Sequence, residues 1–164
     1  MQGDFHRLSA YSAAFQSTQK TQRVLCMFGY TFGNLENEIR FLRNSLADLA
    51  ANDMLLLDVT IARAPADQPA EILKKDPTLS GRRQADLRNL WDLFLSGPFK
   101  RYGSDKVELE FFPTLDMSCA VPGSYGVDLR ATVRSNEGIR EFSVYYSRRY
   151  EPNQLATALA REGW

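Results

Sequence analysis

Residues 23–39 read RVLCMFGYTFGNLENEI, and this stretch decides the fold class. Its apolar run from Val24 to Phe28 predicts a buried β-strand. Gly29 and Gly33 bound a turn, and a helix is expected to begin at Asn34. A strand that turns sharply into the N-terminus of a helix is how open α/β sheets build ligand crevices.

The sequence after this turn is expected to complete a strand–helix–strand unit. The helix carries one apolar stripe with spacings of three and four residues: Leu35, Ile39, Leu42, Leu46 and Leu49. Asn34 occupies the position of an N-cap, and Glu36 lies in the first turn, where the helix dipole favours an acidic group. A parallel second strand is predicted from Met54 to Ile61, and its nearly continuous apolar start is typical of a strand covered on both faces.

Beyond residue 61 the pattern changes to helices followed by strands. Two helices and three strands are predicted, in the order Ala70–Lys75, Gln84–Leu95, Lys106–Phe112, Tyr125–Val133 and Ile139–Ser147. The short turn Asn136-Glu137-Gly138 favours an antiparallel hairpin of the last two strands. A final helix is expected to run from Pro152 to Gly163.

Composition narrows the function classes. The chain has 164 residues, enough for one domain, and its 20 basic and 20 acidic side chains give no basic footprint for nucleic acid or an anionic membrane. We interpret three basic pairs as solvated surface: Lys74-Lys75, Arg82-Arg83 and Arg148-Arg149. Cys26 and Cys119 are too few and too far apart for a disulfide framework or metal site. With no apolar run long enough for a membrane span, we expect a cytoplasmic protein.

A family resemblance emerges from four stretches. The segment Met27–Leu35 is similar to the Gly-Ser-Thr-Ile-Gly-Asn turn of the histidine-specific, S-adenosylmethionine-dependent methyltransferases of the ergothioneine pathway. Gly3-Asp4-Phe5 resembles the family's Asp-Phe pair before this strand, and Asn52–Val59 resembles its Gly-Asp-Leu-Leu-Leu strand. The segment Ser147–Pro152 resembles its Ser-x-Lys-Phe-x-Pro entry to the last helix. The order is right, and the match spans most of the chain.

The resemblance implies an α/β fold, the C-terminal part of a Rossmann-like class I methyltransferase sheet with an inserted α+β substrate subdomain. Residues 1–61 would form the partial core, residues 62–147 the subdomain, and residues 148–164 the helix that returns to the core. The glycine-rich cofactor turn of such enzymes has no counterpart here, so we expect a fragment that is inactive alone. The strand Val24–Phe28 would then have a free edge, through which a homodimer is expected.

The resemblance also implies site residues. Asp4, Phe5, Phe28 and Gly29 would contact the cofactor S-adenosylmethionine, whereas Asn34, Tyr145 and Ser147 would contact a small-molecule substrate. No metal and no catalytic group are assigned. Structural roles explain several of these residues equally well: Asp4-Phe5 as a strand end, Gly29 as a turn glycine and Asn34 as a helix cap. A capping Asn still has its NH₂ free for a substrate carboxylate.

Substrate identity is where the sequence departs from the family. Histidine-methylating members carry a Glu that binds the imidazole where this chain has Tyr145, and a neutral phenol cannot replace that anion. We therefore expect a small amine or amino-acid-like acceptor other than histidine. The alternative is a non-catalytic binding or assembly module with a methyltransferase-like fold. A Gly-x-Gly turn after an upstream strand would favour the enzyme, and its absence would favour the module.

Overall fold

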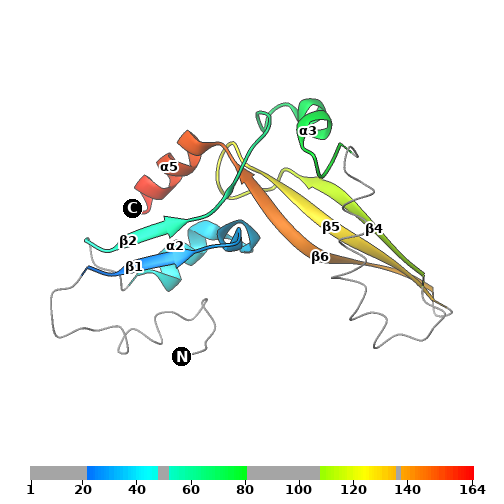
Figure 1. The fold of residues 1–164 in the computed structure, drawn as a ribbon, viewed down its shortest axis with the longest axis horizontal. Helices are drawn as coiled ribbons and strands as arrows, with labels where there is room; N and C mark the ends of the chain where they lie inside the picture. Colours follow the sequence, from blue (N-terminus) through cyan, green and yellow to red (C-terminus); the bar gives the residue numbers. More distant parts are fainter. Residues whose placement is uncertain (1–21, 48–51, 81–107, 136–137) are drawn as a thin grey trace.

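Two β-sheets organise this mixed α/β chain in the computed structural model, which describes residues 22–47, 52–80, 108–135 and 138–164 (Figure 1). The described elements are, in order, β1 (Val24–Met27), the 3-10 helix η2 (Thr31–Asn34), α2 (Glu38–Ser45), β2 (Met54–Leu57), β3 (Thr60–Ile61), α3 (Pro69–Lys75), β4 (Glu108–Asp116), β5 (Tyr125–Ser135), β6 (Gly138–Tyr150) and α5 (Pro152–Arg161). The predicted α/β class is confirmed. The predicted helix Gln84–Leu95 lies outside the described residues.

The short sheet consists of β1 and β2, which are parallel, with Val24 opposite Met54 and Met27 opposite Leu57. The predicted parallel strand–helix–strand unit is therefore confirmed. At the amino ends of both strands the Asp53 carboxylate accepts hydrogen bonds from the Arg23 backbone N–H at 2.9 Å and from its guanidinium at 2.5 Å. This pair ties the start of β1 to the start of β2 and helps to fix their register.

The sequence predicts that the second strand is covered on both faces and runs from Met54 to Ile61, and both expectations are wrong. One face of the short sheet is open: Val24 is 56% exposed and Leu56 is 50% exposed, whereas Met27 on the opposite face is buried. Helices α2 and α5 contribute to a core on only one face of this sheet. The apolar residues at the start of the second strand therefore do not mean that both faces of the strand are covered. The strand predicted from Met54 to Ile61 is also divided, because β2 ends at Leu57 and β3 joins the other sheet.

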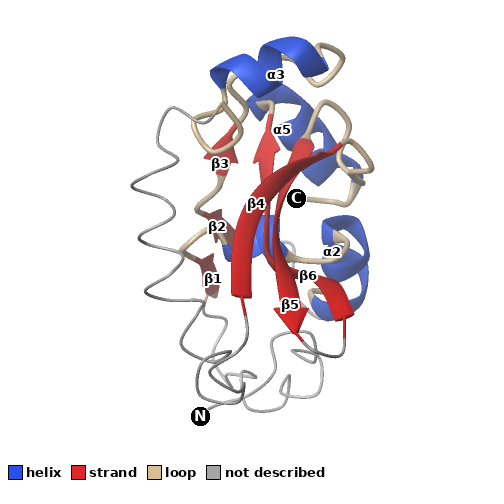
Figure 2. Ribbon diagram, turned by 90° about the vertical axis from the view of Figure 1, so that its right-hand side faces the viewer, coloured by secondary structure: helices blue, strands red, loops and turns tan. Residues whose placement is uncertain are grey.

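The long sheet has the order β3-β6-β5-β4 and curls along its length (Figure 2). Strands β5 and β6 pair antiparallel from Tyr125 opposite Arg149 to Ser135 opposite Gly138, which confirms the predicted hairpin. A β-bulge interrupts the register after Leu129, where Tyr145 and Ser143 face consecutive residues of β5. All three long strands extend beyond their predicted ends.

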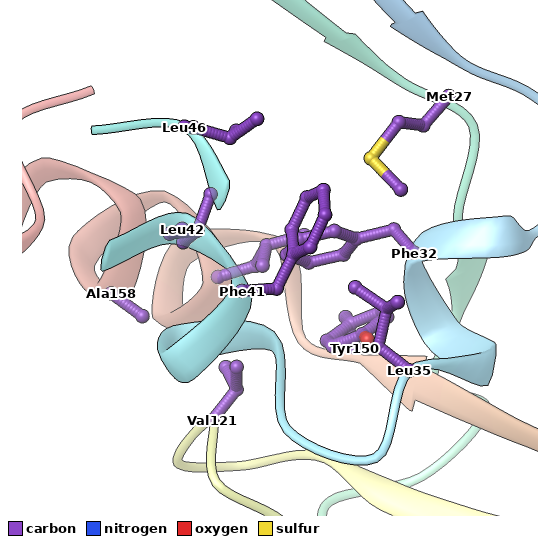
Figure 3. Packing of buried hydrophobic residues seen from close by; sticks show 10 residues of the cluster. Met27, Phe32, Leu35, Phe41, Leu42, Leu46, Val121, Tyr150 and Ala158 are labelled. Carbon is purple, nitrogen blue, oxygen red and sulfur yellow. The ribbon is translucent and has the colours of Figure 1, made fainter. Parts of the chain in front are cut away.

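The main core lies where the two sheets approach each other (Figure 3). It contains residues from β1, the turn, α2 and its C-terminal cap, the connection between β4 and β5, β6 and α5: Met27, Phe32, Leu35, Phe41, Leu42, Leu46, Val121, Tyr150, Leu155 and Ala158. The rings of Phe32 and Tyr150 pack with their centroids 5.9 Å apart. The predicted apolar stripe is confirmed by Leu42 and Leu46, which are buried, and by Ile39, which packs partly buried against the core. Leu35 is buried too but lies before α2, and Leu49 lies outside the described residues. A second, smaller core lies under α3 and includes Ile72 and Tyr125.

Helix α5 begins as the sequence predicts. Pro152 occupies the first turn, and the carboxylate of Glu151 accepts hydrogen bonds from the backbone N–H groups of Asn153 at 3.1 Å and Gln154 at 2.7 Å. The helix ends at Arg161, two residues before the predicted end at Gly163. None of the helices in the described residues is long and apolar enough to cross a membrane.

Candidate functional site

The turn that follows β1 lies at the carboxyl ends of the two parallel strands. Gly29 and Tyr30 both have left-handed backbone, with φ of +67° and +63°, and both are exposed. Tyr30 is the one non-glycine residue in the described part of the chain with positive φ. This conformation costs an L-residue about 1–2 kcal/mol, so it persists only where the surrounding structure holds it, often at functional sites.

Asp58 holds this turn from the end of β2. The backbone N–H of Gly29 donates to the Asp58 carboxylate at 3.1 Å, and the backbone N–H of Asp58 donates to the Met27 carbonyl at 2.9 Å. Thr31 closes the turn by donating its hydroxyl to the Phe28 carbonyl at 2.6 Å. Sequence reasoning missed Asp58, although a first polar residue after an apolar parallel strand is where α/β sheets place ligand-binding groups.

The surface around Gly29 is open and flanked by aromatic rings. A Cβ built on Gly29 would meet no atom within 4 Å, so its backbone conformation, and not crowding, is what favours glycine here. Phe28 and Tyr30 are 61% and 46% exposed. Two predicted cofactor residues, Phe28 and Gly29, thus lie together on an accessible surface. The other two, Asp4 and Phe5, lie outside the described residues.

The predicted capping role of Asn34 is wrong. Helix α2 begins at Glu38, and its cap is Asn37, whose side-chain oxygen accepts from the Arg40 backbone N–H at 2.8 Å. The shift arises because the chain first forms the 3-10 turn η2, in which the Gly33 N–H donates to the Tyr30 carbonyl at 3.0 Å. Asn34 ends η2 and is exposed. Its contact with a substrate stays a prediction.

Arg148 of β6 lies against the backbone on both sides of Asn34 and binds the segment that follows it. Its guanidinium donates to the carbonyls of Leu35 and Glu36, the latter at 2.8 Å. On the other side, a Cβ at Gly33 would lie 3.2 Å from the Arg148 backbone nitrogen, so Gly33 permits a close approach. Sequence analysis did not identify Arg148 as part of the site.

The basic pair Arg148-Arg149 is buried, which corrects its interpretation as solvated surface. The two residues are 5% and 8% exposed, and each guanidinium is paired with a buried carboxylate, although Nε of Arg148 has no hydrogen-bond partner among the described residues. Arg148 lies 3.2 Å from the Glu38 carboxylate, and Arg149 lies 3.1 Å from the Asp76 carboxylate. Buried charges are tolerated only when they are paired in this way. By contrast Lys74 and Lys75 are exposed, as predicted.

The carboxylate of Glu38 contacts both Arg148 and Tyr150. It is fully buried, and burial raises its pKa, although the Tyr150 hydrogen bond and the Arg148 charge act in the opposite direction. The Tyr150 hydroxyl donates to Glu38 Oε1 at 2.5 Å, and burial together with the Glu38 charge raises the pKa of this phenol. A Glu–Arg–Tyr cluster therefore connects α2 to β6 beneath the turn.

The predicted substrate residues Tyr145 and Ser147 lie on the opposite face of β6 from the Arg148 side chain. Tyr145 pairs with Leu129 and is 43% exposed, whereas Ser147 pairs with Val127 and is buried. Within the described ranges, no hydrogen bond joins either side chain to the turn that carries Gly29. The structure thus brings Phe28 and Gly29 together and leaves Tyr145 and Ser147 on a separate face of β6, where Tyr145 is exposed and Ser147 is buried.

Tyr146 shares the face of Arg148 and forms a polar cluster of its own. Its hydroxyl donates to the Asp116 carboxylate at 2.7 Å, and the Arg148 guanidinium lies 4.7 Å from its ring centroid. Burial tends to raise the pKa of Asp116, but hydrogen bonds from Ser118 and Tyr146 hold it below the usual value. The thiol of Cys119 lies 3.6 Å from the Tyr146 oxygen.

No group of three or more His, Cys, Asp and Glu side chains that could hold a metal ion occurs among the residues that the structure describes. Cys26 and Cys119 are both free. Comparison with protein-family models, with curated proteins and with solved structures finds no match to this chain.

Proposed function

We propose that this chain is part of an S-adenosylmethionine-dependent methyltransferase that acts on a small amine or amino-acid-like substrate, within a Rossmann-like α/β core. One observation carries the proposal: Gly29 and Tyr30 form an exposed left-handed turn at the carboxyl ends of parallel β1 and β2, held by Asp58. Ligands of open α/β sheets bind outside the carboxyl ends of the strands. The motif resemblance supplies the choice of ligand.

The residues of the turn fit this chemistry. S-adenosylmethionine supplies the methyl group as a sulfonium, and transfer requires an unprotonated nucleophile that is aligned in a dry site. Phe28 and Tyr30 present exposed rings that would exclude water and face the positive sulfur. The open space at Gly29 leaves backbone accessible to a ligand. The exposed Asn34 would donate its NH₂ to a substrate carboxylate.

A cofactor titration tests the proposal. We expect the chain to bind S-adenosylhomocysteine with a Kd on the order of 1 mM, because its sequence has no glycine-rich cofactor turn. Gly29→Val should abolish this binding, because the branched side chain cannot keep φ at +67° and would cover the open backbone. Gly163→Val is the matched control, since Gly163 also has positive φ and open space around it but lies at the far end of α5.

The outcomes separate the parts of the proposal. Equal binding by the two valine variants would contradict a cofactor site at the turn. Submicromolar binding by the unaltered chain would support a methyltransferase but would contradict the proposal that the cofactor site is incomplete here. Ligand-observed NMR measures the weak binding, because a millimolar ligand exchanges rapidly, and isothermal titration calorimetry detects submicromolar binding.

The alternative of a non-catalytic assembly module has one specific observation in its favour. The outer face of the short sheet exposes large apolar side chains at Val24, Phe28, Met54 and Leu56, and such patches often mark interaction surfaces. The edge of β1 opposite β2 has no partner strand among the described residues, so a homodimer through this edge is part of the proposal. A monodisperse monomer in sedimentation velocity would contradict the dimer.

A further inference from the structure

The free thiol of Cys119 lies in a polar cluster with Asp116, Tyr146 and Arg148. Cys119 is partly exposed in the connection between β4 and β5. Its sulfur lies 3.6 Å from the Tyr146 hydroxyl oxygen and 3.9 Å from the Asp116 carbonyl oxygen. The Tyr146 hydroxyl donates its one hydrogen to the Asp116 carboxylate at 2.7 Å. Cys119 is therefore the donor in both contacts, and neither contact occupies a lone pair of its sulfur.

Arg148 brings a buried hydrogen-bond donor without an acceptor to this cluster. Its side chain is 6% exposed, and its Cζ atom lies 4.7 Å from the centroid of the Tyr146 ring. Its terminal nitrogens donate to the carbonyls of Leu35 and Glu36, but its Nε–H has no partner among the described residues. A buried donor without an acceptor is destabilising, so an oxygen atom added beside it would be bound.

The guanidinium of Arg148 is close enough to the thiol for the two groups to interact. Burial tends to lower the pKa of Arg148, but the Glu38 charge, followed by interactions with Tyr146 and Cys119, raises it above the ordinary value. An oxygen atom bonded to the Cys119 sulfur would therefore form beside a cationic donor that now has no acceptor.

Cys26 provides an internal comparison. It is the more exposed of the two free cysteines and lies on the open face of the short sheet with Val24. Within the described ranges, its thiol has no hydrogen-bond or ion-pair partner. Exposure alone would therefore make Cys26 the more reactive thiol, whereas the surroundings of the sulfur favour Cys119.

We propose that Cys119 is a redox modification site, which hydrogen peroxide oxidises to a sulfenic acid that the Nε–H of Arg148 stabilises. A lone pair of the Cys119 sulfur attacks one peroxide oxygen, so that an S–O bond forms while the O–O bond breaks. Sulfur loses two electrons, and the second peroxide oxygen gains them. That oxygen takes up the thiol proton and leaves as water. The site does not depend on the proposed function.

Peptide mapping after peroxide treatment tests the proposal. The folded full chain is exposed to limiting hydrogen peroxide with excess dimedone, which traps sulfenic acids, and the adducts are counted by mass spectrometry. We expect the adduct to form roughly tenfold faster on Cys119 than on Cys26, because a hydrogen bond to a charged donor stabilises the new oxygen only at Cys119. In the chain unfolded in guanidinium chloride the two rates should become similar, because both thiols are then solvated.

Two variants separate the contacts of the cluster. Tyr146→Phe keeps the ring beside Arg148 but removes the hydroxyl that binds the thiol, and it should slow the reaction of Cys119. Arg148→Lys keeps a positive charge beside Glu38 but removes the Nε–H, and it should also slow the reaction. Neither change should alter the rate at Cys26, and thermal unfolding shows whether each variant is folded.

The rates decide the outcome. Equal rates at the two cysteines of the folded chain, or a faster reaction of Cys26, overturn the proposal. A Cys119 rate that the folded Arg148→Lys variant leaves unchanged also overturns it, because the buried donor would then not stabilise the product. Where Arg148→Lys does not fold, the comparison of Cys119 with Cys26 and the Tyr146→Phe rate decide in the same way.

Discussion

The guanidinium of Arg148 lies 3.2 Å from the carboxylate of Glu38, and this ion pair joins β6 to the first residue of α2 inside the protein. Both side chains are almost completely buried. Arg148 also donates to the carbonyls of Leu35 and Glu36, so one side chain connects the long sheet to the turn that carries Asn34. The geometry of the candidate site therefore depends on a contact between segments more than 100 residues apart.

Removal of Arg148 should be strongly destabilising. Arg148→Met leaves Glu38 buried without its counter-charge, and breaking a buried pair in this way costs about 3–5 kcal/mol. The double variant with Glu38→Gln should be less destabilised than Arg148→Met alone, because no buried charge is then left unpaired. Urea unfolding measures both. Arg43→Met, which breaks the pair between the exposed Arg43 and Glu162, is the control and should change stability little.

The buried carboxylate of Glu38 should also make stability depend on pH. Burial raises its pKa in the folded state above the ordinary value of 4.5, so between these two values the folded protein binds more protons than the unfolded chain. The contribution of Glu38 to stability is then fully present below pH 4.5 and is lost as the pH rises through the raised pKa.

A comparison of wild type with Glu38→Gln isolates this effect. The stability of wild type relative to the Gln variant should fall as the pH increases from about 4 to about 7, in urea unfolding at several pH values. A relative stability that increases with pH would mean that the folded protein lowers the pKa of Glu38, and would contradict the prediction.

Gly29 should tolerate asparagine better than alanine. Because nothing lies within 4 Å of a Cβ at this position, the cost of Gly29→Ala is conformational, about 1 kcal/mol for a residue with positive φ. Asn adopts the left-handed region more readily, so Gly29→Asn should lose less. Thermal unfolding of the two variants gives the comparison. An equal loss for both would indicate that the turn does not keep its left-handed backbone in solution.

Gly126 should be intolerant of any side chain for a different reason. The Tyr146 ring crosses β5 at this glycine to reach Asp116, and a Cβ at Gly126 would lie 2.1 Å from the Tyr146 hydroxyl oxygen. Gly126→Ala should therefore displace Tyr146, with a cost of about 1–3 kcal/mol. In a Tyr146→Ala background the same change should cost much less, since the obstacle is gone. A purely additive double variant would show that the two residues do not collide.

Local patterns in the sequence predicted most of the described helices and strands, but not all of their boundaries or which residues they contact. The leucine spacing of α2, the proline at the start of α5 and the hairpin of β5 and β6 are local signals, and all three predictions are confirmed. The division between β2 and β3 was not predicted, because Val59 and Ile61 look like a continuing apolar strand. The division depends on Thr60 and Ile61 pairing with the distant end of β6.

In the candidate site, too, the sequence indicated local features but not the contacts between distant segments. The sequence correctly predicted a glycine turn after an apolar strand, but it placed Phe28 in a buried strand, whereas Phe28 follows β1 and is exposed. The cofactor contacts of Phe28 and Gly29 stay a prediction. The burial of Arg148 and Arg149 gave no local signal, because two adjacent arginines on a strand read as surface unless their partners Glu38 and Asp76 are known. Asn34 resembled a helix cap because it directly precedes the apolar stripe that starts at Leu35, but the chain forms the 3-10 helix η2 first, and the cap is Asn37.

The most direct measurement is an amide-resolved NMR titration of the ¹⁵N-labelled chain with S-adenosylhomocysteine. We predict that the amides of Gly29, Tyr30 and Asp58 shift together and saturate with a Kd of about 1 mM, while adenosine alone shifts them less because it lacks the amino acid group. Unchanged amides at these three residues up to about 10 mM ligand, or shifts confined to residues outside the turn, would contradict a cofactor site at the turn.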